Sequence, residues 1–348
     1  MIQLWGKDYT REELLRRVGD MRQVAGVEPF ELTDGSQRGV RAVRLWNAAG
    51  LNFTVAAERG MSLTNLTWRG VPIPFLSAVG TVHPAYYEPE GLGWLRTWPV
   101  GFLTPCGLTQ AGAPCSDDGE QLGLHGRVAH IPAQNIHWGA EWRGEEYYLW
   151  VEADVRETAV FGANLLLHRR ISTTLTSPTL WIEDRIENQG FSASPHLFMQ
   201  HINIGHPLID STTSLDLPER ITVPSDENAR LGLEQCCSFG EPLIGCEEQV
   251  FFHELTPDDD GNVEVRLVNP AFANGAGLGM CLRYALKAYP VLTEWKMMRE
   301  GLYVVGVEPG NCRSLGRARI RENGDLPILG PGETRNYHLE ITFFTNQG

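Results

Sequence analysis

The sequence contains few positively charged residues. Lys and Arg total 29 against 43 Asp and Glu, so the formal net charge is −14 at pH 7. Proteins bind nucleic acid and anionic membrane surfaces chiefly through Lys and Arg. We therefore expect neither nucleic acid nor membrane as a partner, and instead a small molecule that is neutral or cationic.

The sequence also lacks the features of secreted, membrane-spanning and disulfide-bonded proteins. Its start, MIQLWGKDYTREELL, has no apolar signal-peptide core, and no stretch approaches the roughly 20 apolar residues of a membrane span. The seven cysteines form no CxxC pair and are odd in number, which favours reduced thiols over a disulfide framework or a structural zinc site. We expect a soluble, cytoplasmic protein that is a monomer or a homodimer.

No Rossmann or P-loop glycine pattern, internal repeat or low-complexity linker is present. Apolar residues instead alternate with polar ones, which indicates half-buried antiparallel strands. The alternation runs through residues 41–46, 51–55, 179–186 and 337–343. The 37 glycines and 21 prolines suit a chain that turns often. The sequence therefore predicts a mainly β protein, a large antiparallel sandwich that forms one domain over residues 1–348.

Three segments depart from this strand pattern. Residues 1–27 are expected to form a helical extension, because Thr10 and Glu13 make a capping box. The apolar stripe of that helix comprises Leu14, Leu15, Val18 and Met21. Residues 82–135 are long and rich in Gly, Pro and aromatic residues, which favours a functional loop over disorder. Residues 210–261 are acidic and turn-rich, and we expect them to be a surface excursion.

The centre of the sequence holds an apolar run that polar side chains interrupt, Leu197 to Gly205. If it is a strand, Gln200 shares one face with apolar residues, while His201 and Asn203 share the other. Burying an imidazole or an amide without a hydrogen-bond partner costs about 1–3 kcal/mol. A ligand is therefore one candidate partner for these groups, and a satisfied core histidine is the other interpretation of His201.

Four stretches carry groups capable of chemistry: 93–98, 123–127, 200–203 and 306–311. Together they supply one carboxylate, two imidazoles and one guanidinium, a set suited to moving protons on a polyhydroxylated ligand. The residues concerned are Glu308, His125, His201 and Arg96. The tryptophans on either side of the guanidinium suit the apolar faces of sugars.

Each of these residues also has a simpler interpretation. Arg96 could serve packing through a cation–π or ion-pair contact, and His125 could be a turn histidine. Glu308 could pair with Arg313 or Arg317. The nearby acidic group of Asp117, Asp118 and Glu120 is expected to be a solvated turn.

In combination, the motifs resemble the aldose 1-epimerase (galactose mutarotase) superfamily. The resemblance rests on HGR, then QHIN, then EWK followed by YVVGVEP, and a closing LGPGET. The order GLGWLR, CGLTQAGAP, LGLHGR and EPGN is similar to an uncharacterised, DUF4432-like bacterial branch of that superfamily. The resemblance runs from about Gly39 to Phe344. It implies a galactose mutarotase-like β supersandwich with a sugar cleft, and exchange of the α and β anomers of a free sugar without metal or organic cofactor.

The resemblance also implies roles for individual residues. Glu308 matches the general base that takes the proton of the anomeric hydroxyl, and His201 matches the general acid that protonates the ring oxygen. His125 matches a supporting histidine. The substrate-binding residues expected on this basis are Arg96, Gln200, Asn203, Trp94 and Arg127. Glu308 should be ionised at rest, which a nearby Arg or protonated His would favour.

The sequence departs from better-known mutarotases around the acid histidine. It has Gln200 where they carry Asn, and Ile202-Asn203-Ile204 where they carry a Tyr-Phe-Asn-Leu type run. The identity of the sugar therefore stays open.

Three alternatives remain at this point. The first is a metal site of His125, His201 and Glu308, which predicts loss of activity with a chelator. The second is another carbohydrate enzyme, an isomerase, lyase or glycosidase, and a glycosidase would need a second carboxyl group. Candidates for that carboxyl are Glu88, Glu90 and Glu294. The third is a non-catalytic sugar-binding protein, which would keep its biological function without Glu308.

Overall fold

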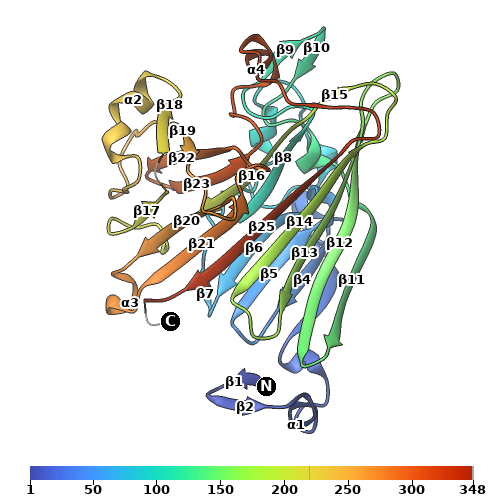
Figure 1. Cartoon of the computed structure of the whole chain (residues 1–348), viewed down its shortest axis with the longest axis vertical. Helices are drawn as coiled ribbons and strands as arrows, with labels where there is room; N and C mark the ends of the chain where they lie inside the picture. The colour runs from blue at the N-terminus through green and yellow to red at the C-terminus, as the bar shows by residue number, and fades with distance from the viewer. Residues whose placement is uncertain (219, 347–348) are drawn as a thin grey trace.

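The strands form two large antiparallel sheets that pack against each other. The computed structural model describes residues 1–218 and 220–346. In Figure 1, the green, orange and red strands of one sheet lie in front of the blue strands of the other. The predicted mainly β, antiparallel architecture is confirmed. Within the described residues, no helix is long and apolar enough to cross a membrane.

The first sheet has eight strands within the described residues. Their order is β11 (Gln134–Arg143), β12 (Glu146–Thr158), β13 (Asn164–Thr174), β14 (Thr179–Asn188), β25 (Thr334–Phe344), β21 (Leu278–Ala285), β20 (Asn262–Asn269) and β17 (Ser214–Asp216). Burial alternates strictly along β12, where every second residue faces the other sheet. One face of this sheet therefore lies in the core, as the period-two pattern predicts.

The second sheet has 11 strands within the described residues and carries the groups of chemical interest. Its order is β18 (Arg220–Pro224), β19 (Gln249–Leu255), β22 (Val291–Arg299), β23 (Leu302–Gly310), β16 (Leu197–Ile204), β8 (Leu103–Leu108), β6 (Ser62–Trp68), β5 (Leu51–Ala56), β4 (Arg41–Trp46) and β3 (Gly26–Glu31), with β7 (Val71–Pro72) beside β6. Every residue of β16 and of β8 is buried. Both faces of the sheet are covered at its centre.

Short strands and helices complete the chain. The two-stranded pairs are β1 (Ile2–Leu4) with β2 (Lys7–Tyr9), β9 (Cys115–Asp117) with β10 (Glu120–Leu122), and β15 (Ser194–Pro195) with β24 (Ile328–Leu329). The α-helices are α1 (Arg11–Leu15), α2 (Glu227–Leu231), α3 (Phe272–Gly275) and α4 (Arg317–Glu322). The 3-10 turns are η1 (Met21–Gln23), η2 (Gly35–Gln37), η3 (Ala57–Arg59), η4 (Pro84–Tyr86), η5 (Gly93–Arg96), η6 (Val128–His130) and η7 (Leu233–Gln235).

The N-terminal helix is shorter than its apolar stripe predicts. Its capping box is present, since the Thr10 hydroxyl accepts from the Glu13 N–H and the Glu13 carboxylate accepts from the Thr10 N–H. The helix ends at Leu15, however, and Leu15 is exposed. Asp20 ends any continuation, because its side chain caps the separate turn η1.

Two segments predicted to lie outside the sheets contribute strands. The long segment 82–135 contains β8, which pairs with β16 at the centre of the second sheet. The sequence of β8, LTPCGL, shows no alternation, because both faces of the strand are buried. It also contains Pro and Gly, which are uncommon inside central strands. Residues 210–261 are likewise not only a surface excursion, because β17 joins the first sheet, while β18 and β19 extend the second.

A buried polar bridge joins the two sheets beneath β16. The Arg169 guanidinium on β13 donates from Nε and Nη2 to the two carboxylate oxygens of Asp184 on β14, at 2.7 Å each. Both side chains are completely buried. Gln200 on β16 accepts from Arg169 at 2.9 Å and donates to Asp184 at 2.7 Å. A bidentate pair of this kind fixes both distance and direction, so the bridge holds β16 in register over the first sheet.

We expect Asp184→Asn to destabilise the protein strongly. The substitution leaves the Arg169 charge buried without a counter-charge, and breaking a buried pair in this way costs about 3–5 kcal/mol of unfolding free energy. Urea denaturation measures the loss. The control is Glu141→Gln, which removes the partner of half-exposed Arg143 and should cost under about 1 kcal/mol. Equal losses in the two variants would contradict the importance of the bridge.

A second prediction concerns His196, whose Nε2 lies 2.7 Å from the Tyr337 hydroxyl. Burial lowers the pKa of His196 from 6.5 to about 4. Because the folded pKa lies below the unfolded one, the stability contributed by the neutral ring is present above pH 6.5 and is lost as the pH falls toward 4. When the pH is lowered from about 7.5 to about 5, the unfolding free energy of the wild type should therefore fall by about 2 kcal/mol more than that of His196→Asn.

Urea denaturation at the two pH values tests this expectation. The control is His338→Asn, which makes the same substitution at a half-exposed histidine of β25. A His196→Asn variant that follows the wild type across the same pH range would show that His196 does not carry the effect.

Candidate active site

His201 stands on the outer face of β16, away from the inter-sheet core. The antiparallel pairing of β16 with β8 and β23 fixes this position. On β8, Thr104 lies opposite His201, and Cys106 lies opposite Met199. Side chains alternate along a strand, so Gln200 points into the core while His201 points out. These two adjacent residues therefore lie on opposite faces of the sheet and contact different groups.

Glu308 reaches His201 from the neighbouring strand β23. Its Oε1 lies 3.2 Å from Nε2 of His201, and the two side chains are 2% and 4% exposed. Glycine at position 306 makes room for the carboxylate, because a Cβ there would lie 2.3 Å from Glu308 Oε1. The predicted acid and base residues are thus in direct contact.

Aromatic rings surround this pair. The ring centroid of Trp98 lies 4.8 Å from that of His201, and the centroid of Trp295 lies 5.6 Å from it. Trp94 packs on Trp98 at 4.6 Å. Three indoles thus line the outer face of β16 and provide apolar surface beside the proton-transfer groups.

His125 joins the cluster from a tight turn. Its ring centroid is 5.3 Å from that of His201 and 5.0 Å from that of Trp94. Its backbone φ is +56°, and its Nδ1 accepts a hydrogen bond from the Gly112 N–H at 3.3 Å. Burial lowers the pKa of His125 to about 4. The ring is therefore neutral at pH 7, with its proton on Nε2, and it is both a turn histidine and part of the site.

Burial opposes charge on both members of the His201–Glu308 pair. Desolvation raises the pKa of Glu308 well above 4.5, and the carboxylate of Glu248 raises it further. Desolvation lowers the pKa of His201 well below 6.5, with His125 adding to the effect. The Arg or protonated His expected to keep Glu308 ionised at rest is not among the groups that act on its pKa. Burial favours the uncharged arrangement of the pair, in which the one proton lies on the carboxyl group.

Several buried polar atoms at this site have no hydrogen-bond partner. They are Trp94 Nε1, His201 Nδ1, Asn203 Oδ1, Thr293 Oγ1 and Glu308 Oε1, whose contact with His201 Nε2 lacks hydrogen-bond geometry. Thr293 stands directly opposite Glu308 in the register of β22 and β23, and Asn203 shares the face of His201. Leaving such groups unpaired costs about 1–3 kcal/mol each. Their concentration around one carboxyl–imidazole pair indicates a place where a small polar ligand makes hydrogen bonds.

Among the predicted substrate-binding residues, Gln200 does not belong to the site. Its amide is occupied by the Arg169–Asp184 bridge and by the Tyr289 hydroxyl, to which it donates at 3.2 Å. The prediction for Gln200 is therefore wrong, because the inter-sheet core already uses both ends of its amide. Asn203 shares the strand face of His201, and Trp94 packs on Trp98 and His125, while their roles in substrate binding stay predictions.

Arg96 and Arg127 lie on the surface. The Arg96 side chain is 73% exposed, with Nε 3.2 Å from the carboxylate of Glu88. Arg127 is 46% exposed and lies 3.7 Å from Glu120. Within the described residues, neither guanidinium contacts His201 or Glu308. Their roles in ligand binding stay predictions.

The alternative partners suggested for Glu308 are occupied elsewhere. Arg313 pairs with Glu254 at 2.8 Å, and Arg317 pairs with Asp117 at 2.6 Å. Asp117 is therefore not part of a solvated acidic turn, because it is buried and accepts hydrogen bonds from Arg317 and Arg321 of α4.

The sequence does not single out two neighbours of the site. Trp295 follows Glu294 in the EWK motif, and its Nε1 donates to the Glu248 carboxylate at 2.8 Å. Arg59 is 1% exposed and donates to the Thr97 carbonyl at 2.8 Å, next to Nε2 of His130 at 3.0 Å. Only the EWK motif offers a signal for Trp295, and nothing in the sequence around Arg59 points to a buried guanidinium.

The metal-site alternative for the histidines is not supported by the spacing of the donor atoms. Across residues 1–218 and 220–346, we looked for His, Cys, Asp and Glu side chains with at least three donor atoms within 4.8 Å of one another. The group that meets this spacing is Cys236, Cys237 and Glu294. His125, His201 and Glu308 do not meet this spacing.

Solved structures share this fold. A Klebsiella pneumoniae protein, provisionally assigned as an aldose 1-epimerase, superposes with a TM-score of 0.86 at 22% identity, over 92% of this chain and 88% of that one. A galactose mutarotase-like protein from Clostridium acetobutylicum gives 0.62 at 11%, over 93% and 99%. The galactose 1-epimerase of Lactobacillus acidophilus gives 0.53 at 14%, over 92% and 99%. The fold is therefore that of the galactose mutarotase-like proteins.

The family follows from the sequence itself. Residues 37–343 match the family described as "Domain of unknown function (DUF4432)", and the chain belongs to that family. The resemblance carried by the short motifs is thereby confirmed. No curated protein sequence is significantly similar to this chain.

Proposed function

We propose that this protein interconverts the α and β anomers of a free sugar by general acid–base catalysis. The observation that carries the proposal is the buried contact between Glu308 Oε1 and His201 Nε2 at 3.2 Å. The names of the structural relatives, aldose 1-epimerase and galactose 1-epimerase, support the same reaction class.

Anomer exchange needs one base and one acid at the same time. A base removes the proton of the anomeric hydroxyl while an acid protonates the ring oxygen, and the bond between C1 and the ring oxygen breaks to give the open-chain aldehyde. Rotation about C1–C2 and the reverse proton movements close the ring on the other face. Each positioned group contributes typically about 10²–10⁴-fold.

The one proton carried by either member of the pair supplies both functions. Glu308 acts as the base and His201 as the acid when the proton lies on the imidazole. Hydroxyl groups of a bound sugar donate to the carboxylate and replace the water lost by burial, so binding favours this charged arrangement. His125 supports the sugar as a hydrogen-bond donor, because its accepting Nδ1 leaves the proton on Nε2.

The aromatic side chains account for recognition of a sugar ring. Trp98 and Trp295 flank His201, and an indole face packs well on the apolar C–H groups of a sugar. Access requires displacement of these side chains, because His201 and Glu308 are both buried. Arg96 and Arg127 on the surrounding surface are the proposed outer contacts of the ligand.

Glu308→Gln is expected to lower the rate of anomer exchange by about 10²–10⁴-fold while sugar affinity changes only a few-fold, because the amide keeps the shape but takes no proton. Polarimetry on a freshly dissolved sugar measures the rate, and calorimetry measures affinity. The control is Glu254→Gln, an exposed carboxylate on β19 of the same sheet. Wild-type turnover in Glu308→Gln would reject the assignment of the base.

The pH dependence of the rate follows from the one-proton state of the pair. At low pH the enzyme is inactivated when a second proton binds to the pair, on the imidazole of His201. Because burial lowers the pKa of His201, the rate should begin to fall on the acid side only below pH 6.5. Loss of the shared proton gives the alkaline limb, and burial raises the pKa of Glu308 well above 4.5. We expect a plateau across neutral pH between the two limbs. A rate that rises steadily with pH through 6.5 would contradict a shared proton.

A further inference from the structure

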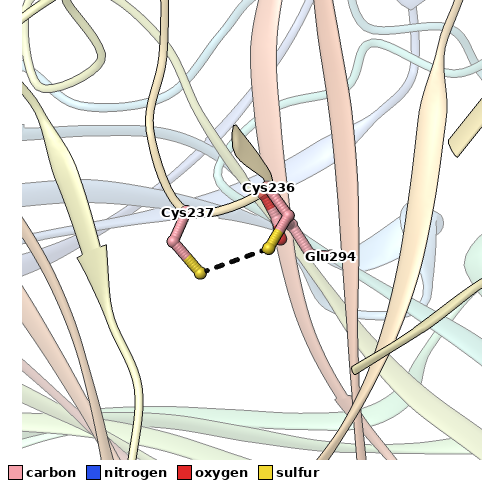
Figure 2. A group of neighbouring side chains, drawn as sticks. All are labelled: Cys236, Cys237 and Glu294. Atoms are coloured by element: carbon pink, nitrogen blue, oxygen red, sulfur yellow. Dashed lines mark hydrogen bonds between the residues drawn. The ribbon is translucent and has the colours of Figure 1, made fainter. Parts of the chain in front are cut away.

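A second cluster of reactive side chains lies on the other face of β22. Glu294 precedes Trp295 in that strand, so its side chain points away from the candidate active site. Figure 2 shows its carboxylate beside the sulfur of Cys236, with Cys237 next along the chain. The two cysteines directly follow η7. The proposed sugar chemistry uses none of these groups.

The donor atoms of this cluster converge. The sulfurs of Cys236 and Cys237 are 3.5 Å apart, as the dashed line in Figure 2 marks. The two sulfurs and a Glu294 oxygen all lie within 4.8 Å of one another. Glu294 is completely buried, and its Oε1 has no hydrogen-bond partner. A buried carboxylate oxygen without a donor is costly unless a cation neutralises it.

Neighbouring side chains hold the cluster in place. The second carboxylate oxygen of Glu294 lies 3.0 Å from Nε2 of His253, whose Nδ1 lies 2.9 Å from the Thr222 hydroxyl. Lys296 donates to the carbonyls of Gln235 and Ser238, at 2.8 and 2.7 Å. These two residues flank Cys236 and Cys237 directly, so Lys296 ties the cysteine segment to β22. Ligating carboxylates are commonly supported by such hydrogen-bonded neighbours.

We propose that Cys236, Cys237 and Glu294 bind a thiophilic divalent metal ion of the zinc class. Tetrahedral zinc with Zn–S bonds of about 2.3 Å holds two sulfurs about 3.8 Å apart, close to the separation of the two cysteine sulfurs. Two thiolates and one carboxylate carry three negative charges, which the ion and the Lys296 ammonium together balance. Binding releases the thiol protons to solvent, and a water or a ligand fills the fourth position.

The probe is the metal ion alone, added to the full chain. Purified protein is stripped with a chelator, dialysed and titrated with Co²⁺, whose thiolate charge-transfer absorption reports sulfur ligation, and then with Zn²⁺ in competition. We expect one ion per chain with a sulfur-to-cobalt band. Because loss of a supporting neighbour alone weakens metal sites by about 10–100-fold, Cys236→Ser, Cys237→Ser and Glu294→Gln should each weaken binding by at least about 100-fold.

Cys281→Ser is the matched control, because Cys281 is a half-buried thiol of the other sheet and should leave the titration unchanged. Circular dichroism identifies any variant that fails to fold. If a variant at a buried position fails, the titration of Cys237→Ser, at a half-buried position, tests the proposal. Absence of the charge-transfer band in the wild type overturns the proposal, as does equal binding by wild type and Cys237→Ser. A Cys236–Cys237 disulfide found by mass spectrometry in protein purified under reducing conditions also overturns it.

Discussion

The two faces of β16 lie in different environments, and the contacts on one face position the groups on the other. On its inner face, Gln200 is tied into the buried Arg169–Asp184 pair, which belongs to the opposite sheet. On its outer face, the next residue, His201, meets Glu308. A slip of one residue would exchange the two faces, placing the imidazole in the core and the amide under the tryptophans. The polar bridge therefore fixes the register that makes the candidate active site.

Burial gives that site its chemical character. A carboxyl group and an imidazole in contact without surrounding water share one proton, and small changes around them decide which group holds it. The unpartnered atoms of Trp94, Asn203 and Thr293 lie around the pair. Hydrogen bonds from a sugar to these atoms would relieve their cost and change the environment of the pair in the same step. In the proposed reaction, recognition of the sugar and proton transfer are therefore linked through desolvation.

The sequence predicts residues that belong to a short motif, but it does not show which face of a strand lies in the core. Glu308, His201 and His125 could be predicted from short motifs, and the structure brings them together. Gln200 was placed wrongly, because alternation shows that neighbours face opposite sides but does not show which side is the core. The strand β8 was missed for a related reason, since a strand buried on both faces has no alternation to detect.

The proposed metal site could not be found from the sequence. Two adjacent cysteines do not match the CxxC spacing of common zinc sites, and Glu294 comes from a strand distant in the chain. Only the pairing of β22 with β19 and the path of the segment after η7 bring the carboxylate to the sulfurs. Glu294 and Trp295, adjacent in one strand, thus belong to two different sites on opposite faces of one sheet.

Anomer exchange on a free sugar is the reaction proposed for this protein. Two-dimensional exchange NMR on equilibrated free sugars tests it most directly, with and without wild-type protein, across aldoses, ketoses and acidic sugars. For at least one sugar, we expect exchange cross-peaks between the two anomeric signals that intensify in proportion to protein concentration. Exchange rates equal to the buffer rate for every sugar in the panel would contradict it.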